Sequence, residues 1–287
     1  MSITRKAAEN IASVLSEGLP YIQRFYGKII VVKYGGAAMS KTELKKGFAK
    51  DIALMKLVGM KPVVVHGGGP QIRKELEKAG LKEKFLSGHR VTDRQTMRIV
   101  QKVLINKVNK EIVSLINNFG ANAASLTYKN SKFMVANKID KPMESKLKLV
   151  GTVKSVRINE IKKILVKDHI PVIAPLGLDK QGNCLNINAD VVAGAIAQSL
   201  KSEKLILLTD VEGILNKKGI LLSKMSPKRA KIILKNEIVK GGMKPKLIAA
   251  IETISKGVKS AHIIDGRVPH AVLLEVLTKE GVGTLIS

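Results

Sequence analysis

The feature of this sequence that most constrains its fold is the alternation of short apolar runs with longer segments of helical periodicity. Five runs rich in β-branched residues predict strands at Ile29–Lys33, Pro62–His66, Ile170–Pro175, Leu205–Thr209 and His262–Asp265. Helices are predicted at Thr42–Val58, Gln71–Ala79, Thr92–Asn118, Ala189–Leu200, Pro227–Asn236 and Lys246–Lys256. The first four runs are almost continuously apolar, as expected of strands covered on both faces. The pattern therefore predicts an α/β fold around a largely parallel sheet.

Two further segments have their own character. The stretch from Leu126 to Arg157 mixes polar and β-type residues and predicts one or two β-hairpins beside the main sheet. Met1–Pro20 has the pattern of an amphipathic helix, whose apolar face must pack on the fold or on another subunit. No linker stands out, so we expect two lobes that share one sheet, with a seam near Leu178–Ala189.

Composition excludes several classes of protein. The single cysteine, Cys184, excludes an internal disulfide and a cysteine-based zinc site, and it fits a reducing, cytoplasmic setting. No apolar run reaches about 18 residues, so we expect no membrane-spanning helix. The net charge is +27, but the basic residues are spread along the chain and there is no Trp to stack on bases. We therefore do not expect nucleic-acid binding as the main function.

Glycines that follow strands are the most informative motif. They occur in Tyr34-Gly35-Gly36, in Gly67-Gly68-Gly69-Pro70 and in Asp210-Val211-Glu212-Gly213, while Gly241-Gly242 precedes a helix. In an open α/β sheet, ligands bind beyond the carboxyl ends of the strands, where glycine allows backbone N–H groups to approach an anion closely. Several such turns at one edge could hold a phosphate donor and a carboxylate acceptor together. The Walker motif and the complete dinucleotide motif are both absent.

Three charged residues could serve phosphoryl transfer, which needs cations around the transferred group. Lys33 ends a buried strand, Lys246 starts a helix, and Asp190 could hold the two lysines by charge pairing. The alternative is that Lys33 reaches solvent from a sheet edge and that Lys246 is a surface residue. His66 is interpreted as a structural histidine, and the remaining histidines lack metal-ligand spacing.

Two polar motifs could bind an acceptor. Arg90 is a candidate for a bidentate carboxylate clamp, or alternatively a surface partner of Asp93. Asn186, Asn188 and Asp190 alternate before a helix of small residues, where they could face a ligand or cap the helix.

These motifs, in this order from about Pro20 to Ser287, resemble the amino-acid kinase family. Six motifs carry the resemblance: Lys33-Tyr34-Gly35-Gly36, Val65-His66-Gly67-Gly68-Gly69-Pro70, Arg90-Val91-Thr92, Asn186-Ile187-Asn188-Ala189-Asp190, Thr209–Leu215 and Gly241–Lys246. The resemblance implies a three-layer αβα sandwich around a mainly parallel sheet. It also implies ATP-dependent phosphorylation of the side-chain carboxylate of N-acetyl-L-glutamate, in arginine biosynthesis. Mg²⁺ would be carried on the nucleotide phosphates, with no dedicated metal site on the protein.

The resemblance also implies a role for each motif. Lys33 and Lys246 would stabilise the transferring phosphoryl group, with Asp190 organising them. The acceptor would be bound by Gly68, Gly69, Arg90 and Asn186. The nucleotide would be bound by Gly35, Gly36, Asp210, Val211, Glu212, Gly213, Ile214, Leu215, Ile238, Val239 and Lys240.

Features of both chain ends resemble an arginine-inhibited branch of the family. This resemblance implies an oligomerisation helix at residues 1–20, which would join homodimers into a hexameric ring. It further implies a substrate-binding and dimerising lobe at 21–180 and a nucleotide-binding lobe at 181–287. The candidates for an arginine site are Tyr21, His270, Glu280 and Gly283, and the alternative for the tail is a simply packed helix and turn.

Two other hypotheses remain open from the sequence. A related kinase could form the acyl phosphate on a carrier-linked aminoadipate or glutamate, and the excess of lysine would suit an acidic carrier. Alternatively, the chain could be a basic sensor or binding protein with secondary catalysis.

Overall fold

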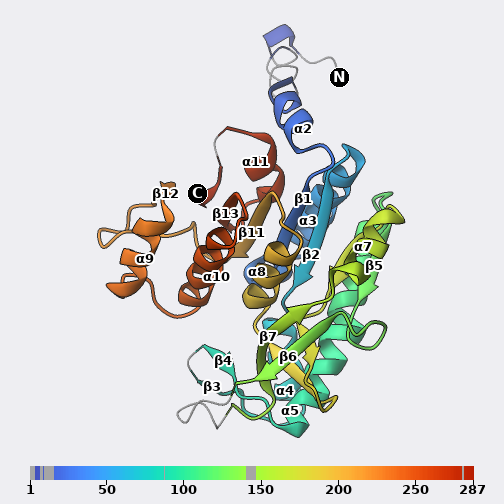
Figure 1. Cartoon of the computed structure of the whole chain (residues 1–287). Helices are drawn as coiled ribbons and strands as arrows, with labels where there is room; N and C mark the ends of the chain where they lie inside the picture. Colours follow the sequence, from blue (N-terminus) through green and yellow to red (C-terminus); the bar gives the residue numbers. More distant parts are fainter. Residues whose placement is uncertain (1–3, 7–8, 10–15, 87, 140–146, 280) are drawn as a thin grey trace.

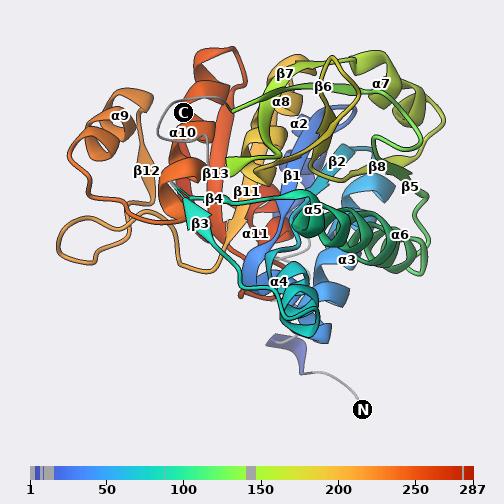
Figure 2. The ribbon, with the colours of Figure 1, turned by 90° about the horizontal axis from the view of Figure 1, so that it is seen from below.

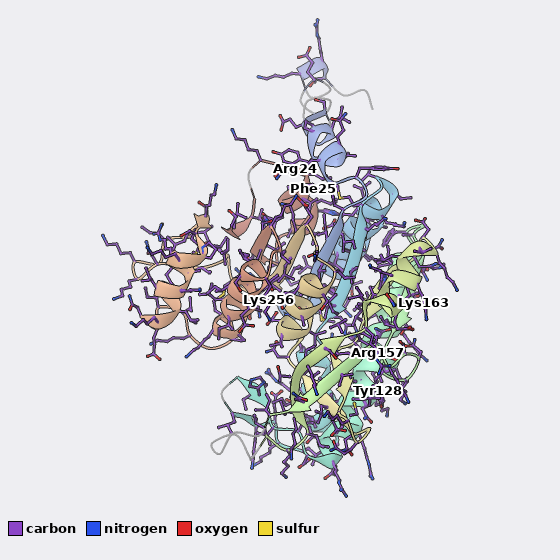
Figure 3. All side chains as sticks on the ribbon, viewed as in Figure 1. Arg24, Phe25, Tyr128, Arg157, Lys163 and Lys256 are labelled. Carbon is purple, nitrogen blue, oxygen red and sulfur yellow. The ribbon has the colours of Figure 1, made fainter. Side chains whose placement is uncertain are left out.

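The computed structural model describes residues 4–6, 9, 16–86, 88–139, 147–279 and 281–287. The expected amphipathic helix of residues 1–20 therefore lies mostly outside the described residues. Its last residues enter α2 (Leu19–Phe25), which stands at one end of the molecule (Figure 1). Phe25, the last residue of α2, belongs to the hydrophobic core, and the neighbouring Arg24 has its Cζ 5.2 Å from the Phe25 ring centroid (Figure 3). The Lys204 Nζ lies 4.9 Å from the same centroid.

An eight-stranded sheet forms the middle layer, in the order β12-β14-β13-β11-β1-β2-β8-β5. Its strands are β1 (Ile29–Tyr34), β2 (Lys61–His66), β5 (Ala123–Leu126), β8 (Ile170–Ile173), β11 (Lys204–Thr209), β12 (Lys224–Met225), β13 (Ser260–Asp265) and β14 (Gly283–Ile286). All neighbouring pairs are parallel except β13 with β14. The mainly parallel sheet is as predicted.

Helices cover both faces of this sheet, so the αβα sandwich is confirmed. One face carries α3 (Thr42–Leu57), α4 (Gly69–Lys78), α11 (Ala271–Leu277) and a long helix formed by α5 (Arg94–Gln101), the π-helical segment η2 (Lys102–Asn109) and α6 (Lys110–Asn117). The other face carries α7 (Ile158–Val166), α8 (Ala189–Ser199) and α10 (Met243–Ser255), as the view from below shows (Figure 2). Side chains of β1 and β2 alternate between the two cores: Ile30, Val32 and Val64 face one, whereas Val31, Val63 and Val65 face the other.

Smaller elements flank the main sheet. The predicted hairpin region forms β6 (Met134–Lys138) and β7 (Val150–Val156), which pair antiparallel and close into a small four-stranded sheet with β9 (Leu176–Leu178) and β10 (Cys184–Ile187). A short hairpin joins β3 (Phe85–Leu86) to β4 (His89–Arg90). The 3₁₀ segment η1 (Gly36–Met39) follows β1, and α9 (Pro227–Lys235) packs on α10.

Five predicted boundaries were wrong by two or three residues. Helix α4 begins at Gly69 rather than Gln71, and strand β13 begins at Ser260 rather than His262. The strand expected over Ile170–Pro175 ends at Ile173, because Pro175 has no N–H to continue the ladder and the chain turns there into β9. The long helix begins at Arg94 rather than Thr92, since the Asp93 side chain accepts a hydrogen bond from the Thr96 N–H and caps it. Helix α10 begins at Met243 rather than Lys246. No described helix is long and apolar enough to span a membrane.

Candidate active site

The glycine turns meet at one edge of the sheet. Strands β2, β1 and β11 are adjacent and parallel, so the residues that follow them share that edge. The Gly67 N–H donates to the Tyr34 carbonyl at 2.7 Å. A Cβ built on Gly35 would lie 3.7 Å from the Gly67 Cα and 2.9 Å from the Lys33 Nζ. Any larger residue at Gly35 would therefore press on the ammonium group of Lys33.

Lys33, Asp190 and Lys246 form one buried cluster at this edge. Asp190 Oδ1 lies 3.2 Å from the Lys33 Nζ, and Oδ2 accepts a hydrogen bond from the Lys246 Nζ at 3.1 Å. The side chains of Lys33 and Asp190 are 8% and 5% exposed. Both sequence alternatives were wrong: Lys33 lies on a central strand, and Lys246 is largely buried. The contact between Lys33 and Oδ1 is an ion pair without an aligned hydrogen bond, so the ammonium can still donate to a ligand.

Burial and the neighbouring charges have opposing effects on the pKa values of the cluster residues. Burial lowers the pKa of Lys33, an effect that the Asp190 carboxylate counteracts and Lys246 reinforces. For Asp190, burial alone would raise the pKa, but the two ammonium groups outweigh it and hold that pKa below its usual range. A single carboxylate thus stays ionised between two cations.

A pocket of about 200 Å³ opens beside this cluster and contains the predicted acceptor residues Gly68, Gly69, Arg90 and Asn186. The first turns of α4 and α8 border it, and their backbone N–H groups favour an anion. Asn188 caps α8 by accepting a hydrogen bond from the Asp190 N–H at 2.8 Å, which confirms the capping interpretation. A Cβ on Gly68 would lie 2.6 Å from the Leu104 Cδ2, so glycine lets α4 and η2 approach each other there.

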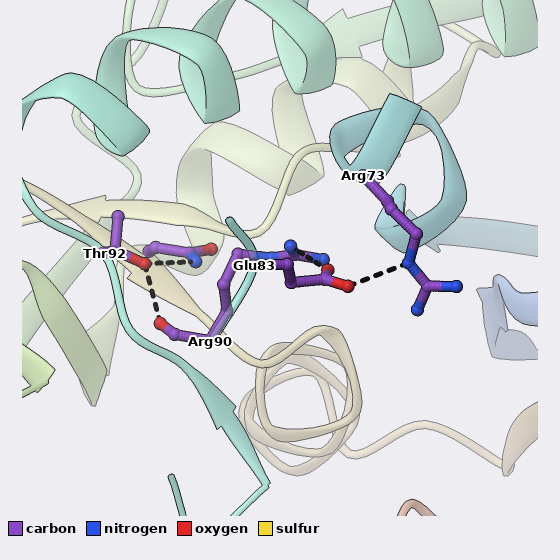
Figure 4. A network of polar contacts seen from close by, with 5 residues as sticks. Arg73, Glu83, Arg90 and Thr92 are labelled. Carbon is purple, nitrogen blue, oxygen red and sulfur yellow. Dashed lines mark hydrogen bonds and ion pairs between the residues drawn. The ribbon is translucent and has the colours of Figure 1, made fainter. Parts of the chain in front are cut away.

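Arg90 lies in this pocket within a polar network (Figure 4). Its Nη1 donates to Glu83, and its Cζ lies 5.0 Å from the Phe85 ring centroid. The alternative of a surface pair with Asp93 was wrong, because Asp93 caps α5 and pairs with Lys148 at 3.6 Å. The Arg90 carbonyl accepts a hydrogen bond from the Thr92 hydroxyl at 2.7 Å, and the Asn186 amide donates to that hydroxyl at 3.1 Å. The two predicted acceptor residues Arg90 and Asn186 are therefore linked.

His66 has a structural environment, as predicted. It is fully buried, its Nδ1 lies 2.7 Å from the Gly67 carbonyl, and its Nε2 lies 3.0 Å from the Asn109 amide nitrogen. These partners fit a neutral ring that donates from Nδ1 and accepts at Nε2. Burial lowers the pKa of His66 to about 4, so the ring is neutral at pH 7.

The predicted nucleotide residues fall into two groups. Gly35 and Gly36 follow β1, and Asp210 to Leu215 follow the adjacent strand β11, so these two segments share the sheet edge. The loop is held by the Ile214 N–H, which donates to the Thr284 hydroxyl at 2.8 Å. Ile238, Val239 and Lys240 lie in the connection between α9 and α10, ahead of the helix that carries Lys246.

The candidates for an arginine site are less closely grouped. Tyr21 borders a pocket that also contains Leu274 and Thr278. His270 pairs instead with the buried Asp51, with Nδ1 and Oδ1 2.5 Å apart, and Gly283 is a buried residue of β14. Glu280 lies outside the described residues.

The sequence analysis missed four residues of the site. Glu83 and Phe85 contact the Arg90 guanidinium, Thr92 bridges Arg90 to Asn186, and Asn109 holds His66. Only Thr92 had a signal, because it directly follows the Arg90 motif. Within the described part of the chain, no group of three His, Cys, Asp or Glu residues could hold a metal ion.

Known proteins are similar to this chain in sequence and in fold. The family model described as "Amino acid kinase family" matches residues 28–265. An acetylglutamate kinase from Hydrogenovibrio crunogenus is 51% identical over 296 residues, covering 100% of this chain and 99% of that protein. An acetylglutamate kinase from Neisseria meningitidis serogroup C is 48% identical, covering 98% of this chain and 95% of that protein.

Solved structures give the same result for the fold. The protein smu.665 from Streptococcus mutans UA159 matches with a TM-score of 0.78 at 32% identity, over 90% of this chain and 98% of that chain. N-acetylglutamate synthase from Neisseria gonorrhoeae, complexed with coenzyme A and N-acetyl-glutamate, matches with a TM-score of 0.87 over 96% of this chain and 63% of that chain. At 23% identity, the second likeness shows the fold alone.

Proposed function

This chain belongs to the amino acid kinase family, and we propose that it transfers the γ-phosphoryl group of ATP to the side-chain carboxylate of N-acetyl-L-glutamate. The product would be N-acetyl-L-glutamyl 5-phosphate, an intermediate for arginine biosynthesis. The observation that carries the proposal is the buried Lys33–Asp190–Lys246 cluster, which borders a pocket containing Arg90. Acetylglutamate kinases about 50% identical over nearly their whole length support this choice of acceptor.

The chemistry follows from the charges in the cluster. A carboxylate oxygen of the acceptor attacks the γ-phosphorus as the bond to the β–γ bridging oxygen breaks, and ADP leaves with that oxygen. Lys33 and Lys246 would neutralise charge on the transferring group and the bridging oxygen, and Asp190 would hold both lysines in place. No general base is needed, because a glutamate side chain with a pKa of about 4.3 is already ionised at pH 7.

The pocket would orient the acceptor for this attack. Arg90 would grip a carboxylate, Asn186 would hold a second polar group, and the N–H groups at Gly68 and Gly69 would favour negative charge. Such positioning replaces a bimolecular encounter by an oriented one, which is a large part of catalysis in a reaction without covalent steps on the protein.

The nucleotide would lie on the other side of the cluster. Gly35 and Gly36 would approach its phosphates, while the segments 210–215 and 238–240 would surround the rest. Bound with the nucleotide, Mg²⁺ would supply further neutralisation of the phosphate oxygens. The carboxylates of Asp210 and Glu212, in the loop after β11, are oxygen donors of the kind that would suit a Mg²⁺ ion carried mainly by phosphates and water.

Finer features of the proposal concern assembly and regulation. We propose the lobes 21–180 and 181–287, a homodimer or a hexameric ring joined through residues 1–20, and feedback inhibition by arginine near Tyr21, His270, Glu280 and Gly283. The enzyme would work in the cytoplasm. The pocket lined by Tyr21, Leu274 and Thr278 supports a regulatory site at this end of the molecule.

The decisive experiment measures ADP release with ATP, Mg²⁺ and N-acetyl-L-glutamate, against free glutamate, a carrier-linked glutamate and no acceptor. Each arm is run with and without arginine. We expect turnover only with N-acetyl-L-glutamate, and a kcat lowered by roughly a hundred- to a thousand-fold in folded Lys33→Ala. Turnover with only the carrier-linked acceptor would replace the proposed substrate, and near-normal kcat in Lys33→Ala would refute the role of the cluster. Turnover unaffected by arginine would remove the regulatory part alone.

A further inference from the structure

Glu83 bridges two arginines beside the acceptor pocket. One carboxylate oxygen accepts from the Arg90 Nη1, and the other accepts from the Arg73 Nε at 2.8 Å (Figure 4). The three residues come from different segments: Arg73 lies on α4, Glu83 precedes β3, and Arg90 ends β4. The bridge therefore ties the β3–β4 hairpin to the helix whose first turn borders the pocket.

The bridge also fixes the orientation of the Arg90 guanidinium. A guanidinium has one edge formed by Nε–H and Nη2–H, which can grip a carboxylate with two parallel hydrogen bonds. With Nη1 occupied by Glu83, this edge stays available, and no described residue accepts a hydrogen bond from it. A Cβ built on Gly69 would lie 3.9 Å from Nη2, so this nitrogen points to the first turn of α4.

We propose that Glu83 is a positioning residue for the acceptor: it holds Nη1 of Arg90 and thereby turns the free Nε–Nη2 edge toward Gly69, where a carboxylate of the acceptor binds. The acceptor would then lie between this edge and the N-terminal amides of α4. The identity of the acceptor rests on the proposed function above. Glu83 itself does not touch the acceptor, since its two oxygens are occupied by the two arginines.

Two other contacts of Arg90 explain why the side chain needs this third one. The Arg90 Cζ lies over the Phe85 ring, and the Thr92 hydroxyl donates to the Arg90 carbonyl. Neither contact determines the directions in which the Nη1 and Nη2 nitrogens of Arg90 point. A hydrogen bond to Nη1 does so, because it has a preferred direction.

The test compares two substitutions of nearly equal size, Glu83→Gln and Glu83→Met. The amide oxygen of glutamine can still accept from Nη1, whereas the thioether of methionine is a poor acceptor. We expect Glu83→Met to raise KM for N-acetyl-L-glutamate roughly tenfold, with kcat within about threefold and KM for ATP unchanged. We expect Glu83→Gln to keep KM at or below the wild-type value, because it retains the orientation and removes only a competing charge.

Titration calorimetry with N-acetyl-L-glutamate in the absence of nucleotide checks the same order of affinities. Glu160→Ala is the matched control, since Glu160 is also an ion-paired glutamate, bound to Lys163 at 2.7 Å, but does not line the pocket. Glu83→Ala is the second variant if Glu83→Met does not fold, and it should behave in the same way.

The outcomes separate the alternatives. Lower KM in both Glu83→Met and Glu83→Gln would mean that Glu83 acts only as a competing charge. Parallel changes in kcat, both KM values and melting temperature would mean a purely structural role, and either result overturns the proposal. If both variants bind the acceptor as tightly as a wild-type protein that binds it normally, the positioning role of Glu83 is overturned while the proposed function stands. Wild-type protein that binds no N-acetyl-L-glutamate would overturn the proposed function, and this inference with it.

Discussion

Asp190→Asn is the substitution whose effect the structure constrains most tightly. It keeps the shape of the side chain but removes the one negative charge between Lys33 and Lys246. Removing one partner of a buried ion pair typically costs 3–5 kcal/mol, because the remaining charge is left without compensation. Lys33 can limit this cost by losing its proton, since burial already lowers its pKa. We therefore expect the lower end, about 3 kcal/mol of unfolding free energy.

This loss should be visible in melting experiments. For a chain of this size, each kcal/mol shifts the melting temperature by roughly 2–4 °C, so Asp190→Asn should melt roughly 6–12 °C below the wild type at pH 7.5. Its kcat should fall by at least about a hundred-fold, because the lysines lose the group that positions them. Thermal and urea melts, together with the ADP-release assay, measure both quantities.

The double variant Lys33→Met with Asp190→Asn identifies the cause. Removing both members of a buried pair can be nearly neutral for stability, so this variant should be more stable than Asp190→Asn alone, although it stays inactive. An Asp190→Asn protein that melts within about 2 °C of the wild type would refute the reasoning. Equally, a double variant whose losses simply add would show that the two side chains are not energetically coupled.

Three further predictions follow from the same geometry. In a plot of kcat against pH, activity should fall on the alkaline side with a midpoint below 10.5, the pKa of an ordinary lysine, because burial lowers the pKa of Lys33. Asp190→Asn should move this midpoint to still lower pH, since it removes the carboxylate that counteracts burial. Burial lowers the pKa of His66 to about 4 in the folded protein, against about 6.5 in the unfolded chain, so the unfolded chain binds the proton first as pH falls. We therefore expect about 3 kcal/mol of stability to be lost as pH falls from 6.5 to 4. Urea titrations across this window should show a flatter profile for His66→Gln, and an identical slope would contradict the assignment. Gly68→Ala places a Cβ 2.6 Å from Leu104 and should raise KM for the acceptor roughly tenfold, while Gly47→Ala in α3, where a Cβ meets only the His270 Cε1 at 3.9 Å, should leave KM unchanged.

The sequence predicted the sheet because its inner strands are buried on both faces. Continuous apolar runs such as those of β1 and β2 have few other stable environments, and the turns after parallel strands must lie at one edge. This reasoning is sufficient to predict that Lys33 and the glycine turns lie at the same edge of the sheet. Strand β14, which lies between β13 and the edge strand β12, carries no such run, and the chain reaches its antiparallel position beside β13 only after the helix α11, so it was not predicted.

Side-chain pairing was the least predictable part of the site. Asp93 is three residues from Arg90 in sequence, yet it serves as the cap of α5, whereas Glu83 reaches Arg90 across the β3–β4 hairpin. The sequence pointed to Asp93 as the partner of Arg90 because Asp93 is near in sequence. The hairpin that brings Glu83 to Arg90 could not be predicted, since strands of two residues give almost no periodic signal. The π-helical segment η2 was likewise hidden, since its apolar pattern is compatible with an ordinary helix.

The two ionic clusters of the site have the same stoichiometry. Lys33 and Lys246 share Asp190 next to the glycine turns, and Arg73 and Arg90 share Glu83 beside the acceptor pocket. In each cluster two cations surround one carboxylate and leave one positive charge. Without Asp190, the two buried ammonium groups would repel each other in a poorly hydrated place, whereas Arg73 of the second cluster is 60% exposed and its repulsion from Arg90 is better screened. With two carboxylates in either cluster, the attraction for an anion would disappear. An acceptor with one carboxylate to be gripped and another to be phosphorylated matches this pair of residual charges, which is why we expect a free monocarboxylate to bind weakly even when it fits the pocket.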